Sequence, residues 1–275
     1  MKNDARAAIL RILIVDDSLH DRAEAKAALL KGSTQRYAFV EAASGEAALR
    51  ICRQLPAPDC VVLDFELPDA NALHVLAHLP RDADDFIVIP VVILTGSTSS
   101  SVNQEVLRAG AQDYVGKSWL GPESLTRAVE NAIERHAMLR QLRHDRNRQQ
   151  LCAEVAQAAA GGYTDGLDAL LEQVRLEAQA DVFMHYVGDG INGARMRLQR
   201  CTGIDPQSRD AFACLPLDQV ALRLHAHGAH GHAACPLMVD GRMIGMLHFA
   251  TQTRACFDAS ELSFIALVGR QISGA

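Results

Sequence analysis

The sequence predicts an α/β protein whose N-terminal half is a doubly wound, five-stranded parallel sheet. Short apolar runs alternate with helix-forming segments through residues 1–121. This rhythm is typical of parallel strands joined by right-handed crossover helices. A segment with no Gly or Pro then extends from Pro122 to Gly161, which predicts a long helix. Beyond it, apolar runs separated by turn signals predict a smaller α+β domain with an antiparallel sheet.

Local signals mark the helices and the second strand of the first half. Ser18 is a candidate N-cap for a helix that runs to about Lys31 and stops at Gly32. Residues 40–42 predict a short second strand, and residues 44–46 open a second helix. Two further helices are indicated by the apolar sets Leu73, Val75, Leu76 and Val102, Val106, Leu107, the latter ended by Gly110.

Four apolar runs each end in a side chain suited to phosphoryl chemistry. The runs cover residues 12–15, 60–63, 91–94 and 113–116, and the side chains that follow them are Asp16 and Asp17, Asp64, Thr95 and Lys117. Functional residues of open parallel sheets gather outside the carboxyl ends of the strands, so we expect these five to converge. Three carboxylates at one point repel unless a cation joins them, and Mg²⁺ prefers oxygen ligands. One carboxylate can then accept a phosphoryl group as a nucleophile.

On these residues, 1–121 resemble the receiver domain of two-component response regulators. The resemblance implies that Asp64 accepts phosphate from a histidine kinase or a phosphotransfer protein. It implies Mg²⁺ bound by Asp17, Asp64 and the main-chain carbonyl of Glu66, with Asp16 acting mostly through water. Thr95 and Lys117 would contact the phosphoryl oxygens. Thr95 and Tyr114, an aromatic residue three positions before Lys117, would be the switch residues.

Two positions depart from the family pattern. Lys117 is followed by Ser118 where the family has proline, and Ala72 stands where glycine is usual in the loop after the acceptor strand. Neither change removes a chemical group of the site. We expect any consequence to fall on loop geometry and switching.

Composition predicts a cytoplasmic protein without nucleic-acid or membrane partners. No run of about 18 or more apolar residues is present, so no transmembrane helix is predicted. Seven cysteines without CxxC spacing indicate reduced thiols. The net charge of −6 and the sequence pI near 6.0 give no electrostatic footprint for DNA.

Residues 122–150 are predicted to form a connecting, signalling helix. Pro122 suits the first turn of a helix. An apolar stripe with alternating spacings of four and three residues is typical of a coiled coil and predicts a homodimer through this helix. The stripe consists of Leu125, Val129, Ala132, His136 and Leu139. The alternative is that this is simply the amphipathic last helix of the first domain, because fewer than four clean heptads are present.

Residues 151–275 predict an α+β domain. Helices are expected at 151–160 and 167–178, strands at 182–187, 195–201, 233–239 and 243–251, and a last helix capped by Asp258 with Glu261 three residues later. Asp240-Gly241 predicts a tight hairpin turn. This half is similar to a GAF domain, on the segment Pro236–Leu247 with Phe257, Glu261 and Leu262. The resemblance implies a sensing and dimerisation domain that can hold a small molecule. Thr251–Arg254 stands where cyclic-nucleotide-binding members carry an Asn-Lys pair, which argues against that ligand.

A histidine-rich segment within this half is a second candidate site. Residues 224–235 are expected to form a Gly- and Ala-rich loop that carries His225, His227, His230, His232 and Cys235. Neutral imidazoles at close spacing bind Zn²⁺, Cu²⁺ or Ni²⁺, and one can ligate haem. The spacing matches no zinc module, and a solvated or pH-responsive loop is the alternative.

The function expected from the sequence is that of a phosphorylation-controlled two-component signalling protein. A switch at Asp64 would pass through the connecting helix to the GAF-like domain. The alternatives are the N-terminal regulatory part of a larger sensor kinase or cyclic-di-nucleotide enzyme, or a GAF-based sensor of a metal, haem or small ligand. No kinase, GGDEF-like or helix-turn-helix segment is recognised. Enzymatic activity is therefore left open, apart from hydrolysis of the protein's own aspartyl-phosphate.

Overall fold

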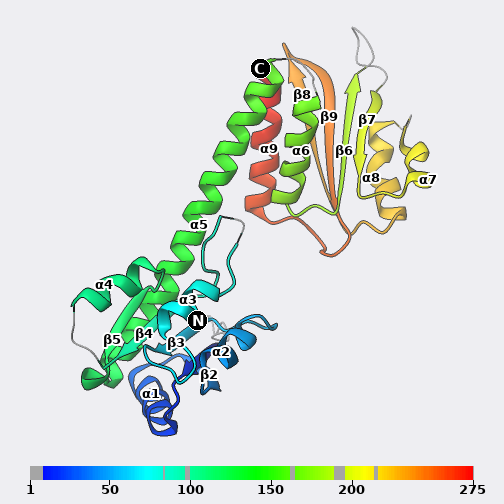
Figure 1. Ribbon diagram of the computed structural model, residues 1–275. Coiled ribbons are helices and arrows are strands. Elements are labelled where there is room, and N and C mark those ends of the chain that lie inside the picture. The colour runs from blue at the N-terminus through cyan, green and yellow to red at the C-terminus, as the bar shows by residue number, and fades with distance from the viewer. Residues whose placement is uncertain are drawn as a thin grey trace, which may run out of the picture. The chain divides into compact units, whose positions relative to one another are not determined.

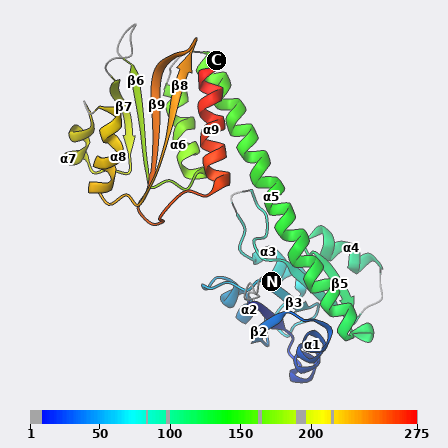
Figure 2. The ribbon, with the colours of Figure 1, turned by 180° about the vertical axis from the view of Figure 1, so that it is seen from behind.

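The computed structural model describes residues 9–82, 84–96, 100–161, 165–188, 196–213 and 216–274 of the 275-residue chain; the side chains of 100–103, 165, 217 and 218 are not described. The chain forms two compact units, Met1–Leu142 and Arg143–Ala275. Figures 1 and 2 show the elements of each unit from opposite sides. Within the part of the chain that the structure describes, every helix is too short or too polar to span a bilayer.

The first unit is built on a five-stranded parallel sheet with the strand order β2-β1-β3-β4-β5 (Figure 1). The strands are β1 (Ile9–Val15), β2 (Arg36–Ala42), β3 (Cys60–Asp64), β4 (Val91–Thr95) and β5 (Asp113–Gly116). The helices are α1 (Leu19–Gly32), α2 (Gly45–Cys52), α3 (Ala72–His78), α4 (Ser100–Arg108), the short 3-10 helix η1 (Lys117–Trp119) and α5 (Pro122–Ala160). The predicted doubly wound fold is confirmed.

Two hydrophobic layers cover the faces of this sheet. Helices α2, α3 and α4 pack on one face, and α1 and the first turns of α5 pack on the other. The strands β3 and β4 are buried along their whole length because both of their faces are covered. Ser18 caps α1 by accepting a hydrogen bond from the amide of Asp21, as predicted for this helix start. Strand β2 begins at Arg36, earlier than the sequence indicated.

The predicted coiled-coil stripe is largely intramolecular, which corrects the seam expected from the sequence. Leu125, Val129 and Ala132 are fully buried in the core formed with the sheet and α1. His136 is also buried, and its Nε2 donates a hydrogen bond of 2.8 Å to the carbonyl of Ile87. These side chains have no surface left for a second copy of the chain. The apolar period of α5 in this region serves its packing as the last helix of the first unit.

The second unit contains a four-stranded antiparallel sheet with the order β7-β6-β9-β8. Its strands are β6 (Val182–Gly188), β7 (Met196–Thr202), β8 (Gly231–Val239) and β9 (Arg242–Thr251). Its helical elements, besides the end of α5, are α6 (Asp165–Glu177), α7 (Pro206–Arg209), η2 (Asp210–Phe212), α8 (Leu217–Ala226) and α9 (Ala259–Ser273). The predicted α+β domain is confirmed.

Each face of this second sheet has its own core. The end of α5 packs with α6 and α9 on one face, and α8 with Phe212 packs on the other, as can be followed in Figures 1 and 2. Asp240 and Gly241 both have positive φ, at 49° and 75°, in the turn between β8 and β9. Asp258 and Glu261 form a capping box at the start of α9, as the sequence predicted.

The expected loop over residues 224–235 is wrong at both ends. Residues 224–226 are the last turn of α8, and residues 231–235 are the first part of β8. Helix α8 was not predicted. The Gly and Ala residues that suggested a loop instead lie at the end of α8, in a short connection and on the edge strand β8. Gly231 on this strand lies close to Thr251 and Cys256.

Candidate functional site

The predicted site residues of the first unit meet at the carboxyl edge of the parallel sheet. Asp16 follows β1, Asp64 ends β3, Thr95 ends β4, and Lys117 follows β5. The strands β1, β3, β4 and β5 are neighbours in that order, and their parallel register places Asp64 beside Leu94 and Thr95 beside Gly116. Residues separated by up to 101 positions in sequence are thereby brought together.

Lys117 is the centre of this arrangement. Its Nζ lies 2.7 Å from Oδ2 of Asp16, 3.0 Å from Oδ1 of Asp64 and 3.1 Å from Oδ2 of Asp21. Asp16 and Asp64 are 1% and 6% exposed, so the ammonium partly balances two buried carboxylates. Asp21 was not among the residues singled out from the sequence.

The acidic triad of Asp16, Asp17 and Asp64 has the donor set expected for a hard divalent cation. One carboxylate oxygen from each residue lies within 4.8 Å of those of the other two. Asp16 and Asp64 are buried, whereas Asp17 is exposed, so the cluster opens to solvent on one side. Three oxygen donors with an open side fit Mg²⁺, which usually keeps several water ligands.

The pKa values at the site follow from burial and from Lys117. Burial raises the pKa of Asp64, and the hydrogen bond from Lys117 opposes this rise. Burial alone would lower the pKa of Lys117, but hydrogen bonds to Asp16, Asp64 and Asp21 raise it overall. The hydrogen bond from Lys117 lowers the pKa of Asp21, against a smaller effect of burial. The lysine is therefore a fixed cation at neutral pH.

Main-chain contacts hold the loop after β1 in place. Oδ1 of Asp16 accepts a 2.8 Å hydrogen bond from the amide of Ser18. The guanidinium of Arg22 donates to the carbonyls of Asp16 and Asp17 at 2.6 and 3.2 Å, and it also pairs with Glu41 at 2.9 Å. Arg22 was not identified from the sequence, although its position one turn into α1 directs it back to the loop.

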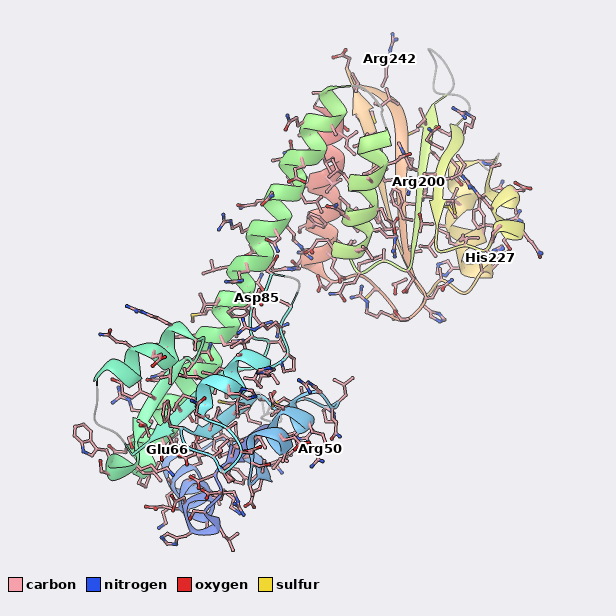
Figure 3. The ribbon with its side chains drawn as sticks, in the orientation of Figure 1. Arg50, Glu66, Asp85, Arg200, His227 and Arg242 are labelled. Carbon is pink, nitrogen blue, oxygen red and sulfur yellow. The ribbon has the colours of Figure 1, made fainter. Side chains whose placement is uncertain are left out.

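The loop after β3 is a tight turn that accepts alanine. Glu66, labelled in Figure 3, forms an isolated β-bridge with Asn71. The amide of Ala72 donates to the carbonyl of Phe65 at 2.9 Å, and the Ala72 side chain is fully buried. Among the described non-glycine residues, Ala72 is not one of those with positive φ. The backbone here does not require the glycine that the family pattern would have.

Thr95 and Tyr114 differ in exposure. Thr95 is 2% exposed at the end of β4, whereas Tyr114 on β5 is 38% exposed. Trp119, two residues after Lys117, is 80% exposed. The site edge therefore has a buried hydroxyl at the end of β4, next to the strand of Asp64, and an accessible aromatic residue on the edge strand β5.

The structure does not gather the five residues of the histidine-rich segment. His225 Nδ1 donates to the carbonyl of Ala229 at 2.7 Å, and His227, labelled in Figure 3, donates to that of Arg223 at 2.9 Å. Exposed His230 donates its backbone amide to the carbonyl of Thr251 at 2.8 Å.

Cys235 lies on the opposite face of the sheet from His232, which corrects the proposed ligand set. Side chains of a strand alternate between its faces, and these two positions differ by an odd number. Cys235 packs in the core with α6 and α9, where it lies against Gly269. Among the described residues, the acidic triad is the one group that brings three metal-binding side chains within 4.8 Å.

His232 instead pairs with His248 of β9, which the sequence reasoning missed. His232 Nε2 and His248 Nδ1 are 2.9 Å apart, and the two rings are stacked. His248 is 2% exposed, and its Nε2 has no hydrogen-bond partner in the described part of the chain. Burial lowers the pKa of His248 to about 3, with a further contribution from His232. A single histidine in the apolar run 243–251 gave no local signal of this pairing.

The parallel sheet with its acidic triad and the α+β domain that follows it each match the model of a known family. The family model for the response regulator receiver domain matches residues 12–130, and that for the GAF domain matches residues 123–275. The chain belongs to the GAF domain family over more than half of its length and carries a response regulator receiver domain before it.

Similar curated proteins include response regulators. The transcriptional regulatory protein KdpE of Mycobacterium tuberculosis is 32% identical over 131 residues, which are 48% of this chain and 54% of that protein. Response regulator MprA of Mycolicibacterium vanbaalenii is 36% identical over 118 residues, which are 43% of this chain and 48% of that protein. The chain spans about half the length of these relatives.

Similar solved structures cover just under half of the chain. Chemotaxis response regulator CheY4 of Vibrio cholerae is 24% identical with a TM-score of 0.40, covering 46% of this chain and 99% of that one. A response regulator receiver domain protein from Clostridium thermocellum is 24% identical with a TM-score of 0.41, covering 48% of this chain and 99% of that one.

Proposed function

We propose that Asp64 accepts a phosphoryl group from a histidine kinase or a phosphotransfer protein. The observation that carries this proposal is the 3.0 Å contact between Asp64 Oδ1 and Lys117 Nζ, with oxygens of Asp16 and Asp17 within 4.8 Å. A carboxylate oxygen of Asp64 attacks phosphorus, the bond from phosphorus to the donor's leaving atom breaks, and the leaving group departs with that electron pair. The nucleophilic carboxylate of Asp64 lies beside the cation of Lys117, which opposes the rise in the Asp64 pKa that burial causes.

The acidic triad would hold Mg²⁺, together with the main-chain carbonyl of Glu66. The bound ion supplies positive charge for the phosphoryl oxygens, which lowers the repulsion between them and the carboxylates. Lys117 neutralises a further oxygen, and the buried hydroxyl of Thr95 donates to another. Water can later attack the aspartyl-phosphate, which returns the site to its starting state.

A phosphorylation assay tests this proposal directly. The full chain is incubated with Mg²⁺ and acetyl phosphate, and its intact mass is measured with time. The expected result is the addition of the mass of one phosphoryl group. No mass should be added when a chelator removes Mg²⁺ before the donor is supplied. A chain that gains no mass with acetyl phosphate or with any phosphorylated histidine donor would contradict the assignment.

We further propose that α5 carries the switch from the receiver domain to the GAF domain. It follows β5, which carries Tyr114, after the short helix η1 that begins at Lys117. The proposed domain limits are 1–121 and 151–275, with 122–150 as the connecting part of α5. Phosphoryl contacts at Thr95 and a new position of Tyr114 would alter the packing between β5 and α5.

Homodimerisation is proposed at the end of the predicted stripe, around Leu139, because the earlier stripe residues are buried within the first unit. Met138, Leu139 and Leu142 are 63%, 45% and 66% exposed, in contrast to the buried residues nearer the start of the helix. A parallel pair of helices would remove these three side chains from water. Six free cysteines among the described residues fit a reducing compartment, so we place this dimer in the cytoplasm.

A small ligand of the GAF domain is a second candidate function. The observation that favours it is the buried Nε2 of His248, which has no partner in the described residues. A buried polar atom without a partner is costly, and a ligand that hydrogen-bonds to it would recover that cost. Native mass spectrometry of the protein as purified from its own host tests this, since a retained ligand adds a defined mass that His248→Ala loses.

A further inference from the structure

Asp21 contacts Lys117 but takes no part in the proposed phosphorylation of Asp64. Its Oδ2 lies 3.1 Å from Lys117 Nζ, although Asp21 belongs to helix α1 and follows no strand. A lysine ammonium has three protons to donate. Asp16 and Asp21 each accept a hydrogen bond from Lys117 Nζ, and Asp64 Oδ1 lies 3.0 Å from it, so the ammonium is shared among three carboxylates.

The orientation of Asp21 is fixed by the start of α1. The Ser18 hydroxyl donates to Asp21 Oδ1 at 3.0 Å, and the amide of Asp21 donates to the same hydroxyl at 3.3 Å. One carboxylate oxygen is therefore held by the helix cap while the other faces Lys117. This division of the two oxygens makes Asp21 a directed partner of the lysine and more than an acidic residue in the first turn of a helix.

Asp21 also differs from the metal-binding carboxylates. It is not part of the group formed by Asp16, Asp17 and Asp64, whose oxygens all lie within 4.8 Å of one another. When those three carboxylates hold a cation, Asp16 and Asp64 have less negative charge to offer Lys117. Asp21 then remains as an anionic partner of the lysine that is held by Ser18.

We propose that Asp21 is a positioning residue that tethers Lys117 and competes for its ammonium with the phosphoryl group on Asp64. This inference rests on the proposed phosphorylation of Asp64. A phosphoryl oxygen on Asp64 must compete with Asp16 and Asp21, which accept hydrogen bonds from Lys117, for the ammonium group. Because Asp21 retains part of the ammonium, the aspartyl-phosphate is held less firmly and hydrolyses sooner. Asp21 thus shortens the lifetime of the phosphorylated state.

The test compares Asp21→Asn with the wild-type chain. Asparagine keeps the shape and can still accept from Ser18, but it lacks the charge that holds Lys117. The protein is loaded with acetyl phosphate, the donor is removed, and the loss of phosphoryl mass is followed. The expected lifetime is about fivefold longer, the size of effect that a partly exposed ion pair produces. Glu24→Gln removes an exposed charge from the same helix and should leave the lifetime unchanged.

A second readout separates this role from a merely structural one. In the Lys117→Gln background, Asp21→Asn should no longer alter the lifetime, because its partner is absent. In the unphosphorylated protein, Asp21→Asn should weaken Mg²⁺ binding measured by calorimetry. Without Asp21, the Lys117 ammonium interacts more strongly with Asp16 and Asp64 and competes with the metal for them. If Asn loosens α1, seen as a lower melting temperature, Asp21→Ser provides the second variant.

The outcomes distinguish the two proposals. A wild-type chain that takes no phosphoryl group overturns the proposed function and this inference with it. A wild-type chain labelled at Asp64, with an unchanged or shorter lifetime in both Asp21 variants, overturns the inference alone. The same applies if Asp21→Asn acts equally in the presence and the absence of the Lys117 ammonium.

Discussion

Lys117 Nζ lies 3.0 Å from Oδ1 of Asp64, although Lys117 follows β5 and Asp64 ends β3, two strands that β4 separates in the sheet. The contact crosses the carboxyl end of β4. It is possible because a lysine side chain is long and the carboxyl ends of β3, β4 and β5 are in register. A cation held in this position by folding alone is available before any metal or phosphoryl group arrives.

Replacement of the acceptor should abolish phosphorylation without unfolding the domain. Asp64→Asn keeps the size of the side chain but removes the nucleophilic charge, so the phosphoryl mass gained with acetyl phosphate should vanish. Asp85→Asn is the matched control, because the Asp85 side chain is 86% exposed and lies outside the site. Undiminished labelling of the Asp64 variant, with an unchanged melting temperature, would place the acceptor elsewhere.

Loss of one triad charge should weaken Mg²⁺ binding. Asp17 is the exposed member of the triad, so Asp17→Asn removes a ligand charge with little effect on the core. The expected loss of Mg²⁺ affinity is on the order of tenfold or more. Mutation of residues that only hydrogen-bond to metal ligands already lowers metal affinity by that much. Isothermal calorimetry measures it in the unphosphorylated protein. Wild-type affinity in this variant would remove Asp17 from the ligand set.

Charged residues in the exposed part of α5 should weaken self-association. Met138→Glu combined with Leu142→Glu puts two negative charges on a face that a parallel dimer would bury. The expected result is a shift from dimer to monomer in sedimentation velocity at equal concentration, with Asp64 labelling intact. Leu222→Glu, at a residue that is 71% exposed on α8, is the matched control. A wild-type chain that stays monomeric at high micromolar concentration, phosphorylated or not, would refute the dimer.

The GAF domain should lose stability as the pH falls. His248 has a folded pKa of about 3 because it is buried, against an ordinary value of 6.5. Between these values the unfolded chain binds a proton that the folded chain does not, so this stability is fully present above pH 6.5 and declines below it. At pH 5 the loss should be about 2 kcal/mol.

Denaturant unfolding at pH 7.5 and pH 5.0 measures this effect. The single tryptophan, Trp119, lies in the first unit, so its fluorescence follows the receiver domain alone. Circular dichroism follows the unfolding of both domains. A circular dichroism transition that is absent from the Trp119 fluorescence therefore belongs to the GAF domain. His248→Asn keeps a partner for His232 but does not titrate, and it should reduce the pH dependence by about 2 kcal/mol. His230→Asn, at an exposed position, should leave it unchanged.

Several features of this protein follow from the sequence by itself, because they are local. The apolar runs 12–15, 60–63 and 91–94, which precede Asp16, Asp64 and Thr95, are buried, so their composition alone identifies parallel strands and the edge where they finish. The cap at Ser18 and the capping box at Asp258 are likewise set by side chains within a few residues of the helix start.

Other features were decided only by the tertiary structure, because they join residues that no local pattern relates. The apolar period of α5 is the same whether the helix faces a partner or its own sheet, and only folding showed Val129 buried within the receiver domain. The alternation of β8 sends Cys235 away from His232, and the antiparallel register brings His248 to it instead. Asp21 contacts Lys117 because α1 begins after β1 and Lys117 follows β5, so both lie at the carboxyl ends of the parallel strands. Distances of this kind depend on the packing of whole elements, which a sequence pattern does not contain.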